Sequence, residues 1–184
     1  VQPCAFVTFT AVWAVITAFR PDSELLTAID AVQHQLAGVV VVDDGSGQGF
    51  EAVLDAIAAR DVTVVRLAEN SGIAAALNAG LEYALAQGCD AAVTFDQDSM
   101  VEPGFIGALE QAHKAARERG HHPGPVVPEY FAGVSQVHSR GSDDTLFARH
   151  SIQSGMLIDR TVLLAVGLLR EDLFIDLVDT EFEL

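Results

Sequence analysis

Residues 91–99 read Ala-Ala-Val-Thr-Phe-Asp-Gln-Asp-Ser, a short apolar run that ends in two carboxylates separated by one residue. Turn-forming residues bound the run on both sides, and this pattern predicts a buried strand. In an extended chain, residues i and i+2 point to the same side, so we expect Asp96 and Asp98 to converge on one cation. Buried carboxylates are costly without a cationic partner. The stretch therefore predicts a metal or metal–phosphate site.

The bulk composition limits the classes of partner. The 184 residues suit one domain, and the half that are apolar can form a substantial core. Ten basic residues against 26 acidic ones give a net charge of −16, which argues against binding nucleic acid or anionic lipid through this segment. An anionic substrate would need a metal or a local basic cluster. Cys4 and Cys89 match no zinc or disulfide spacing, which favours a reducing compartment such as the cytoplasm.

The two ends of the chain carry separate expectations. The longest apolar stretch, residues 5–19, is shorter than the roughly 20 residues that cross a bilayer, so we expect no transmembrane segment in this chain. It also lacks the positive region of a signal peptide. We expect residues 1–10 to be a lead-in of uncertain structure. The chain stops inside an apolar–acidic pattern, so we expect residues 1–184 to form a single domain truncated at its C-terminus.

Strand and helix patterns alternate four times along the chain. Each expected strand is followed by a helical pattern, and the expected strands cover residues 12–17, 39–42, 62–67 and the opening stretch. This alternation predicts an α/β fold, a three-layer α/β/α sandwich with a mostly parallel central sheet. Pro103 is expected at the first position of the fourth helix. Farther on we expect a mobile loop over 129–150, a strand over 152–158 and a short helix over 161–166.

Polar side chains follow each predicted strand at its carboxyl end, where ligands bind in such sheets. They are Arg20, Asp43 and Asp44, Asn70, and Asp96 with Asp98. Asp44 fits a contact with a nucleobase or ribose, or alternatively a turn or helix cap. Asn70 and Asn78 are candidates for binding the substrate, with helix capping the alternative for Asn70. Oxygen ligands of this kind suit Mg²⁺ or Mn²⁺.

The acidic tail of the chain offers candidates for a general base. A base needs one carboxylate within reach of the acceptor hydroxyl. Asp179 is our first candidate, with Asp176 and Glu181 as alternatives.

Six motifs in the order of the chain resemble glycosyltransferase family 2, with its bacterial rhamnosyltransferase-like branch the closest match. They are Thr17-Ala18-Phe19-Arg20-Pro21, VVVVDDGS at 39–46, NSGIAAALNAG at 70–80, TFDQDS at 94–99, SGMLI at 154–158 and EDLFIDLVDTEF at 171–182. The resemblance covers about residues 12–184. It implies the GT-A fold, a Rossmann-like nucleotide-diphospho-sugar transferase architecture. It also implies an inverting, metal-dependent transfer of a sugar, rhamnose being one candidate, from a nucleotide-diphosphate donor.

The same resemblance implies a role for individual residues. Ala18 and Arg20 would line the nucleotide pocket and Asp44 would contact the base. Asp96 would lie near the donor ribose or sugar, and Asp98 would bind the metal through a DxD-type motif. Two further roles complete the set: Gly155 would shape the acceptor side, and Asp179 would deprotonate the acceptor hydroxyl.

The acceptor implied is a saccharide or glycolipid in the synthesis of cell-surface polysaccharide. The full-length protein would act in the cytoplasm, with peripheral association at the inner face of the membrane as a further expectation. Two alternatives stay open, a nucleotidyltransferase and a non-catalytic domain that binds a nucleotide sugar.

Overall fold

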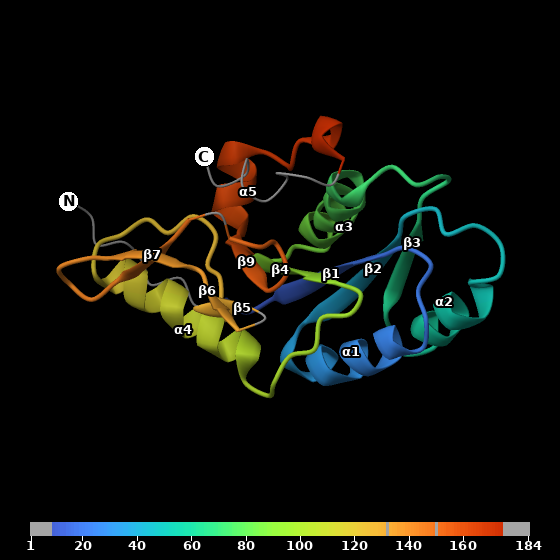
Figure 1. The fold of residues 1–184 in the computed structure, drawn as a ribbon, viewed down its shortest axis with the longest axis horizontal. Coiled ribbons are helices and arrows are strands. Elements are labelled where there is room, and N and C mark those ends of the chain that lie inside the picture. The colour runs from blue at the N-terminus through green and yellow to red at the C-terminus, as the bar shows by residue number, and fades with distance from the viewer. Residues whose placement is uncertain (1–8, 132, 150, 175–184) are drawn as a thin grey trace.

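A five-stranded sheet forms the centre of the molecule in the computed structural model, which describes residues 9–131, 133–149 and 151–174 (Figure 1). The strand order is β3-β2-β1-β4-β9. Four strands run parallel, and β9 lies antiparallel to β4 at one edge. These strands are β1 (Val12–Ala18), β2 (Gly38–Asp43), β3 (Thr63–Arg66), β4 (Ala91–Asp96) and β9 (Met156–Asp159).

Helices cover both faces of this sheet (Figure 1). One face packs against α1 (Glu24–Val32), α2 (Glu51–Ala58) and α4 (Phe105–Glu118), and the other against α3 (Ile73–Ala86) and α5 (Arg160–Val166). Along β1, Ala14 and Ile16 join the first apolar cluster and Val15 joins the second. Because successive residues of a strand face opposite sides, a strand covered on both faces has to be apolar throughout. The predicted three-layer α/β/α sandwich with a mostly parallel sheet is confirmed.

The β-branched runs form the central strands because both of their faces are buried. Val40, Val41 and Val42 are fully inaccessible to solvent. The four predicted strand and helix pairs are all present, with bounds that differ by a few residues. Two short 3-10 helices, η1 (Gln33–Gln35) and η2 (Glu171–Leu173), complete the helical elements among the described residues.

The prediction of a loop over residues 129–150 is wrong in part. This segment contains two antiparallel strand pairs, β5 (Tyr130–Phe131) with β6 (Val134–Ser135), and β7 (Val137–Arg140) with β8 (Leu146–Ala148). These strands are largely exposed, so their polar sequence carries no buried-strand pattern. The strand predicted over 152–158 starts later, at Met156, because residues 153–155 form a bend and turn before it.

The fourth helix begins after Pro103 and not at it. Gly104 precedes the first helical residue, Phe105. The Gln35 side-chain oxygen accepts hydrogen bonds from the N–H groups of Gly104 (3.0 Å) and Ile106 (3.4 Å), so a residue distant in sequence caps this helix. Among the described residues, no helix is long and apolar enough to cross a membrane.

Candidate active site

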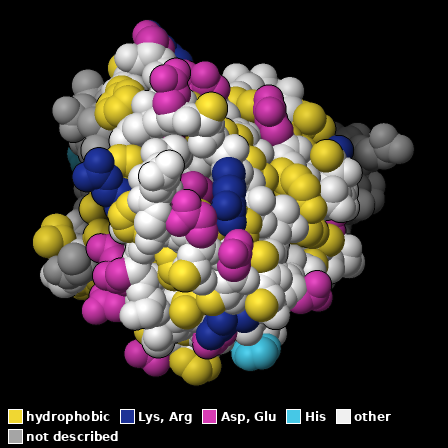
Figure 2. All heavy atoms as spheres, turned by 90° about the vertical axis from the view of Figure 1, so that its right-hand side faces the viewer, with side chains coloured by type: hydrophobic (Ala, Val, Ile, Leu, Met, Phe, Trp, Pro, Cys, Tyr) yellow, Lys and Arg dark blue, Asp and Glu magenta, His cyan; other side chains and the backbone are white. Residues whose placement is uncertain are grey.

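The carboxyl ends of the parallel strands bring the predicted polar residues to one edge of the sheet. The register pairs Ala18 of β1 with Asp43 of β2, and Thr17 of β1 with Asp96 of β4. Figure 2 faces this edge and shows basic and acidic side chains side by side near its centre. The predicted common edge is thus present, although the contacts of individual residues differ from those expected.

Asp44 binds the loop that leads into α3. Its side chain is 6% exposed, and its two oxygens accept the N–H groups of Ser71 (2.7 Å) and Gly72 (3.0 Å). Both N–H groups precede Ile73, the first residue of α3, so the carboxylate holds the loop that leads into the helix. The contact of Asp44 with a base stays a prediction.

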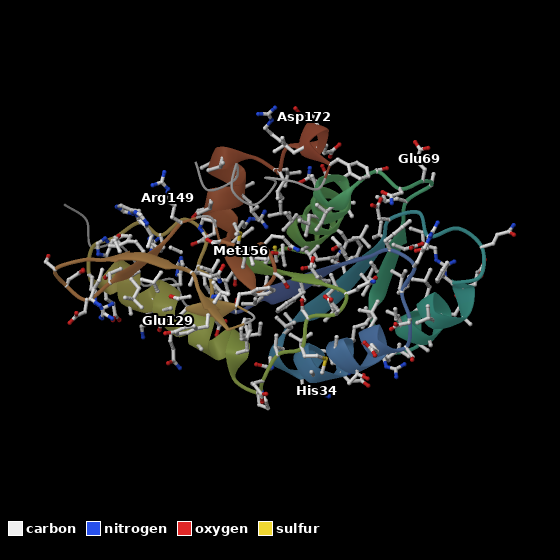
Figure 3. The ribbon with its side chains drawn as sticks, in the orientation of Figure 1. His34, Glu69, Glu129, Arg149, Met156 and Asp172 are labelled. Atoms are coloured by element: carbon white, nitrogen blue, oxygen red, sulfur yellow. The ribbon has the colours of Figure 1, made fainter. Side chains whose placement is uncertain are left out.

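Gly45 explains why a glycine follows the two acids. Its φ of +65° is unfavourable for residues with a side chain, and a β carbon there would lie 2.2 Å from the carbonyl carbon of Glu69. The turn after β2 is thus packed directly on the backbone of the loop between β3 and α3, on which Figure 3 labels Glu69. The two motifs are therefore packed directly against each other.

Arg20 follows β1 and presents a cation at this edge. Its backbone, with φ of 52°, donates a hydrogen bond to the Ser46 hydroxyl at 2.7 Å, and Ser46 in turn donates to Asp43. The guanidinium carbon lies 4.9 Å from the centre of the Phe19 ring. Among the described residues, no carboxylate forms an ion pair with Arg20, so its exposed charge remains available to an anionic ligand.

Residues 91–99 end in a turn after β4, and hydrogen bonds from the segments next to β1 and β9 hold this turn. The strand stops at Asp96, and Ser99 N–H donates to the Asp96 carbonyl at 3.1 Å. On the β1 side, Phe19 N–H donates to the Gln97 side-chain oxygen at 2.9 Å. On the β9 side, the Asp96 carboxylate accepts a hydrogen bond from the Gln153 amide, and Asp96 N–H donates to the Ser154 hydroxyl at 3.3 Å.

The metal prediction needs one correction in its geometry. Asp98 lies in the turn after β4, so strand alternation does not set its direction relative to Asp96. Its exposed side chain makes no hydrogen bond or ion pair with the described residues. Within the described ranges, no three His, Cys, Asp or Glu side chains group as a metal site. The two carboxylates still fit Mg²⁺, which commonly takes one or two carboxylates together with substrate phosphates.

The side-chain amide of Asn78 is hydrogen-bonded within the protein and is not a free amide at the carboxyl ends of the strands. It is 5% exposed, donates to the Leu169 carbonyl and the Glu171 carboxylate, and accepts the Leu169 N–H, each at 2.9 Å. These contacts give Asn78 a structural role, and its predicted contact with the substrate stays a prediction. The hydrogen bonds of Asn78 hold the segment before η2 against α3.

The same segment continues to the start of α3. The Phe174 carbonyl accepts the Ile73 N–H at 2.8 Å, and a β carbon on Gly72 would lie 2.6 Å from the Phe174 ring. Asn70 is exposed and its side-chain oxygen lies 3.3 Å from the Gly72 nitrogen, a local contact in the same loop. Asp179, Asp176 and Glu181 lie outside the described residues.

Gly155 lies where β9 approaches β4. Its N–H donates to the Thr94 carbonyl at 2.7 Å, its φ is +82°, and a β carbon would lie 3.0 Å from the Phe105 ring. The glycine is therefore required by close packing at the site edge, and its acceptor role stays a prediction. A cavity of about 680 Å³ lies elsewhere, between the second half of α4 and β8, and none of the predicted site residues lines it.

Sequence reasoning missed the side chains that hold the turn after β4, namely Gln97, Gln153 and Ser154. Gln97 was visible between the two acids, and Gln153 and Ser154 stood just before an apolar run. No spacing rule connects residues 153 and 154 with 96, because their contacts depend on β9 lying beside β4.

Comparison with known proteins yields one family and several relatives. The model of the family "Glycosyl transferase family 2" matches residues 13–152. The dTDP-rhamnosyl transferase RfbF of Shigella flexneri is 32% identical over 184 residues, covering 93% of this chain and 61% of the relative. The chain thus spans about three fifths of the length of that protein.

Solved structures of S. aureus TarS share the fold. TarS 1–349 in complex with UDP superposes with a TM-score of 0.65 at 15% identity, covering 94% of this chain and 54% of that one. The structure of S. aureus TarS gives a TM-score of 0.58 at 14% identity, covering 94% of this chain and 33% of that one. At this identity the likeness concerns the fold, which is of the GT-A type.

Proposed function

Because the chain belongs to glycosyl transferase family 2, we propose that it forms the donor-binding part of an inverting glycosyltransferase. The sugar moves from a nucleotide-diphosphate donor to a saccharide or lipid-linked acceptor in polysaccharide synthesis, and rhamnose is the first sugar to test because RfbF is named a dTDP-rhamnosyl transferase. The observation that carries the proposal is the common edge at which Arg20, Asp44 and Asp96 end three adjacent strands.

Each residue at this edge would contact or support a different part of the donor. The exposed Arg20 guanidinium supplies positive charge to the diphosphate of the donor in a protein whose net charge is −16. Asp44 holds the loop before α3, so that the Asn70 side chain and the turn after β2 keep a fixed shape around the nucleotide. Asp96, held between β1 and β9, faces the donor ribose or sugar.

A divalent cation completes the donor site in this proposal. Asp98, with Asp96 beside it, would hold Mg²⁺ or Mn²⁺, and such an ion stabilises negative charge on a departing diphosphate as a Lewis acid. Asp179 would remove the proton of the acceptor hydroxyl as general base, a role that contributes on the order of 10²–10⁴-fold to the rate. Gly155 would shape the acceptor side, and the reaction would take place in the cytoplasm, at the inner face of the membrane for a lipid-linked acceptor.

A thermal-shift screen tests donor binding. The ligands are dTDP, UDP and GDP and their sugars, each with Mn²⁺, with Mg²⁺ or with EDTA. A ligand at 100 times its Kd adds about 2.7 kcal/mol of stability, which raises the Tm of a domain of this size by roughly 5–10 °C. A metal-dependent rise with one nucleotide family is expected, and no rise with any of them would refute the proposal.

Turnover by the full chain separates the proposed enzyme from its rivals. Release of nucleoside diphosphate with transfer of the sugar supports the glycosyltransferase. Binding without turnover would favour a non-catalytic domain. Release of pyrophosphate from a nucleoside triphosphate would favour a nucleotidyltransferase, which the family membership does not favour.

A further inference from the structure

Gln153 connects the segment before β9 to the end of β4 through both its side chain and its main chain. The side chain is 5% exposed, and its amide nitrogen donates to the Asp96 carboxylate. Its carbonyl accepts the Thr94 hydroxyl. Figure 3 labels Met156, the first residue of β9, which pairs with Thr94 in the sheet. Gln153 therefore touches a predicted donor-site carboxylate from the segment that leads into the neighbouring strand.

The Gln153 amide is only half satisfied. Its nitrogen has the Asp96 carboxylate as partner, but its buried side-chain oxygen has no hydrogen-bond partner among the described residues. A buried polar atom without a partner costs stability, and an apolar side chain of similar volume would avoid this cost. The amide at this position is therefore explained by what its nitrogen does for Asp96 and not by packing.

The nitrogen of the Gln153 amide faces the Asp96 carboxylate. The oxygens of a carboxylate accept hydrogen bonds, so the amide presents its N–H and not its oxygen to them. A hydrogen bond donated to a carboxylate fixes the plane of its oxygens. The second contact of Asp96, from its own N–H to the Ser154 hydroxyl, fixes the backbone at the same point.

We propose that Gln153 is a positioning residue for donor binding, whose amide holds the Asp96 carboxylate oriented toward the ribose or sugar of the nucleotide-diphosphate donor. This inference rests on the proposed function. Gln153 does not touch the reacting atoms and acts through Asp96.

The test compares Gln153→Leu and Gln153→Glu in the full chain, with the donor KM and kcat measured separately at one pH. Gln153→Leu removes the hydrogen bond to Asp96 and keeps a side chain of similar volume, so the donor KM is expected to rise at least about tenfold with little change in kcat. Gln153→Glu replaces the donating amide nitrogen with an oxygen, so its donor KM is expected to rise at least as much. A purely structural role would lower thermal stability without this selective rise in donor KM.

A matched control separates this effect from a general effect of the substitution. Gln136 also bridges two segments, but among the described residues its amide contacts the Pro128 carbonyl (2.9 Å) and the Ile152 N–H (2.8 Å), and no carboxylate. Gln136→Leu is expected to leave the donor KM unchanged. Thermal unfolding shows that each variant is folded at the assay temperature.

Two results would overturn the inference, and they are distinct. If wild type transfers the sugar and Gln153→Leu keeps the wild-type donor KM, the positioning role is wrong and the proposed function stands. If wild type binds no nucleotide diphosphate or its sugar, the proposed function fails and the role of Gln153 fails with it.

Discussion

Removing the Asp44 carboxylate is expected to loosen the loop before α3. In Asp44→Ala, the N–H groups of Ser71 and Gly72 lose acceptors at 2.7 Å and 3.0 Å. A hydrogen bond to a charged group contributes about 1.5–3 kcal/mol. Ser71 is half-buried, so water can replace part of the hydrogen bond that its N–H loses. The Gly72 N–H keeps a weaker acceptor, the Asn70 side-chain oxygen at 3.3 Å. We therefore expect a loss of about 2–3 kcal/mol in the free energy of unfolding.

Urea denaturation of wild type and Asp44→Ala measures this loss, and the Tm is expected to fall by roughly 5–10 °C. Asp22→Ala is the matched control, because Asp22 is exposed and accepts one local N–H, from Glu24 at 2.8 Å. Its effect is expected to stay within about 1 kcal/mol. If Asp44→Ala destabilises the protein no more than Asp22→Ala, the Asp44 carboxylate does not hold the loop before α3 and this reasoning is wrong.

The remaining predictions concern the metal, the base and the turn after β2. Asp98→Ala is expected to abolish metal-dependent nucleotide binding, and an unchanged calorimetric affinity would remove Asp98 from the metal site. Asp179→Asn is expected to spare donor binding but lower transfer by the full chain at least about 10²-fold; near-normal turnover would place the base elsewhere. Gly45→Ala is expected to cost about 2 kcal/mol more than Gly47→Ala in urea denaturation, because both have positive φ but only Gly45 packs on backbone. Equal costs would contradict that contact.

The strand-end site combines rigid and exposed parts. Asp43, Asp44 and the Asp96 backbone are held by hydrogen bonds within the protein, whereas Arg20 and Asp98 are exposed side chains. This division suits a site in which the scaffold fixes the shape and the exposed charges meet a charged ligand. It also explains why the motif residues are not equivalent, since Asp44 and Asn78 are largely occupied by the protein itself.

The alternation of apolar strands and helical patterns was sufficient to predict the fold. Val39 to Val42 and the run from Ala91 to Phe95 are apolar on both faces, and helices cover both. The parallel order then required Arg20, Asp44 and Asp96 to meet at one edge. These predictions succeeded because they depend on local periodicity and on the direction of the chain, which the sequence carries directly.

Contacts between distant segments could not be predicted in this way. The strand pairs β5–β6 and β7–β8 carry no buried-strand pattern because most of their residues are exposed. Asn78 turns to Leu169 only because the segment before η2 lies along α3.

The amino-acid sequence by itself determined the layers of this protein, the edge at which its polar residues gather and the family to which it belongs. The tertiary structure alone decided which of these residues are already occupied and which neighbours hold them. Gln153 reaches Asp96 because β9 runs antiparallel beside β4, and Asp44 reaches Ser71 because the loop before α3 passes over the end of β2. Such contacts depend on how strands and loops are placed in space, and no local pattern in the chain specifies that placement.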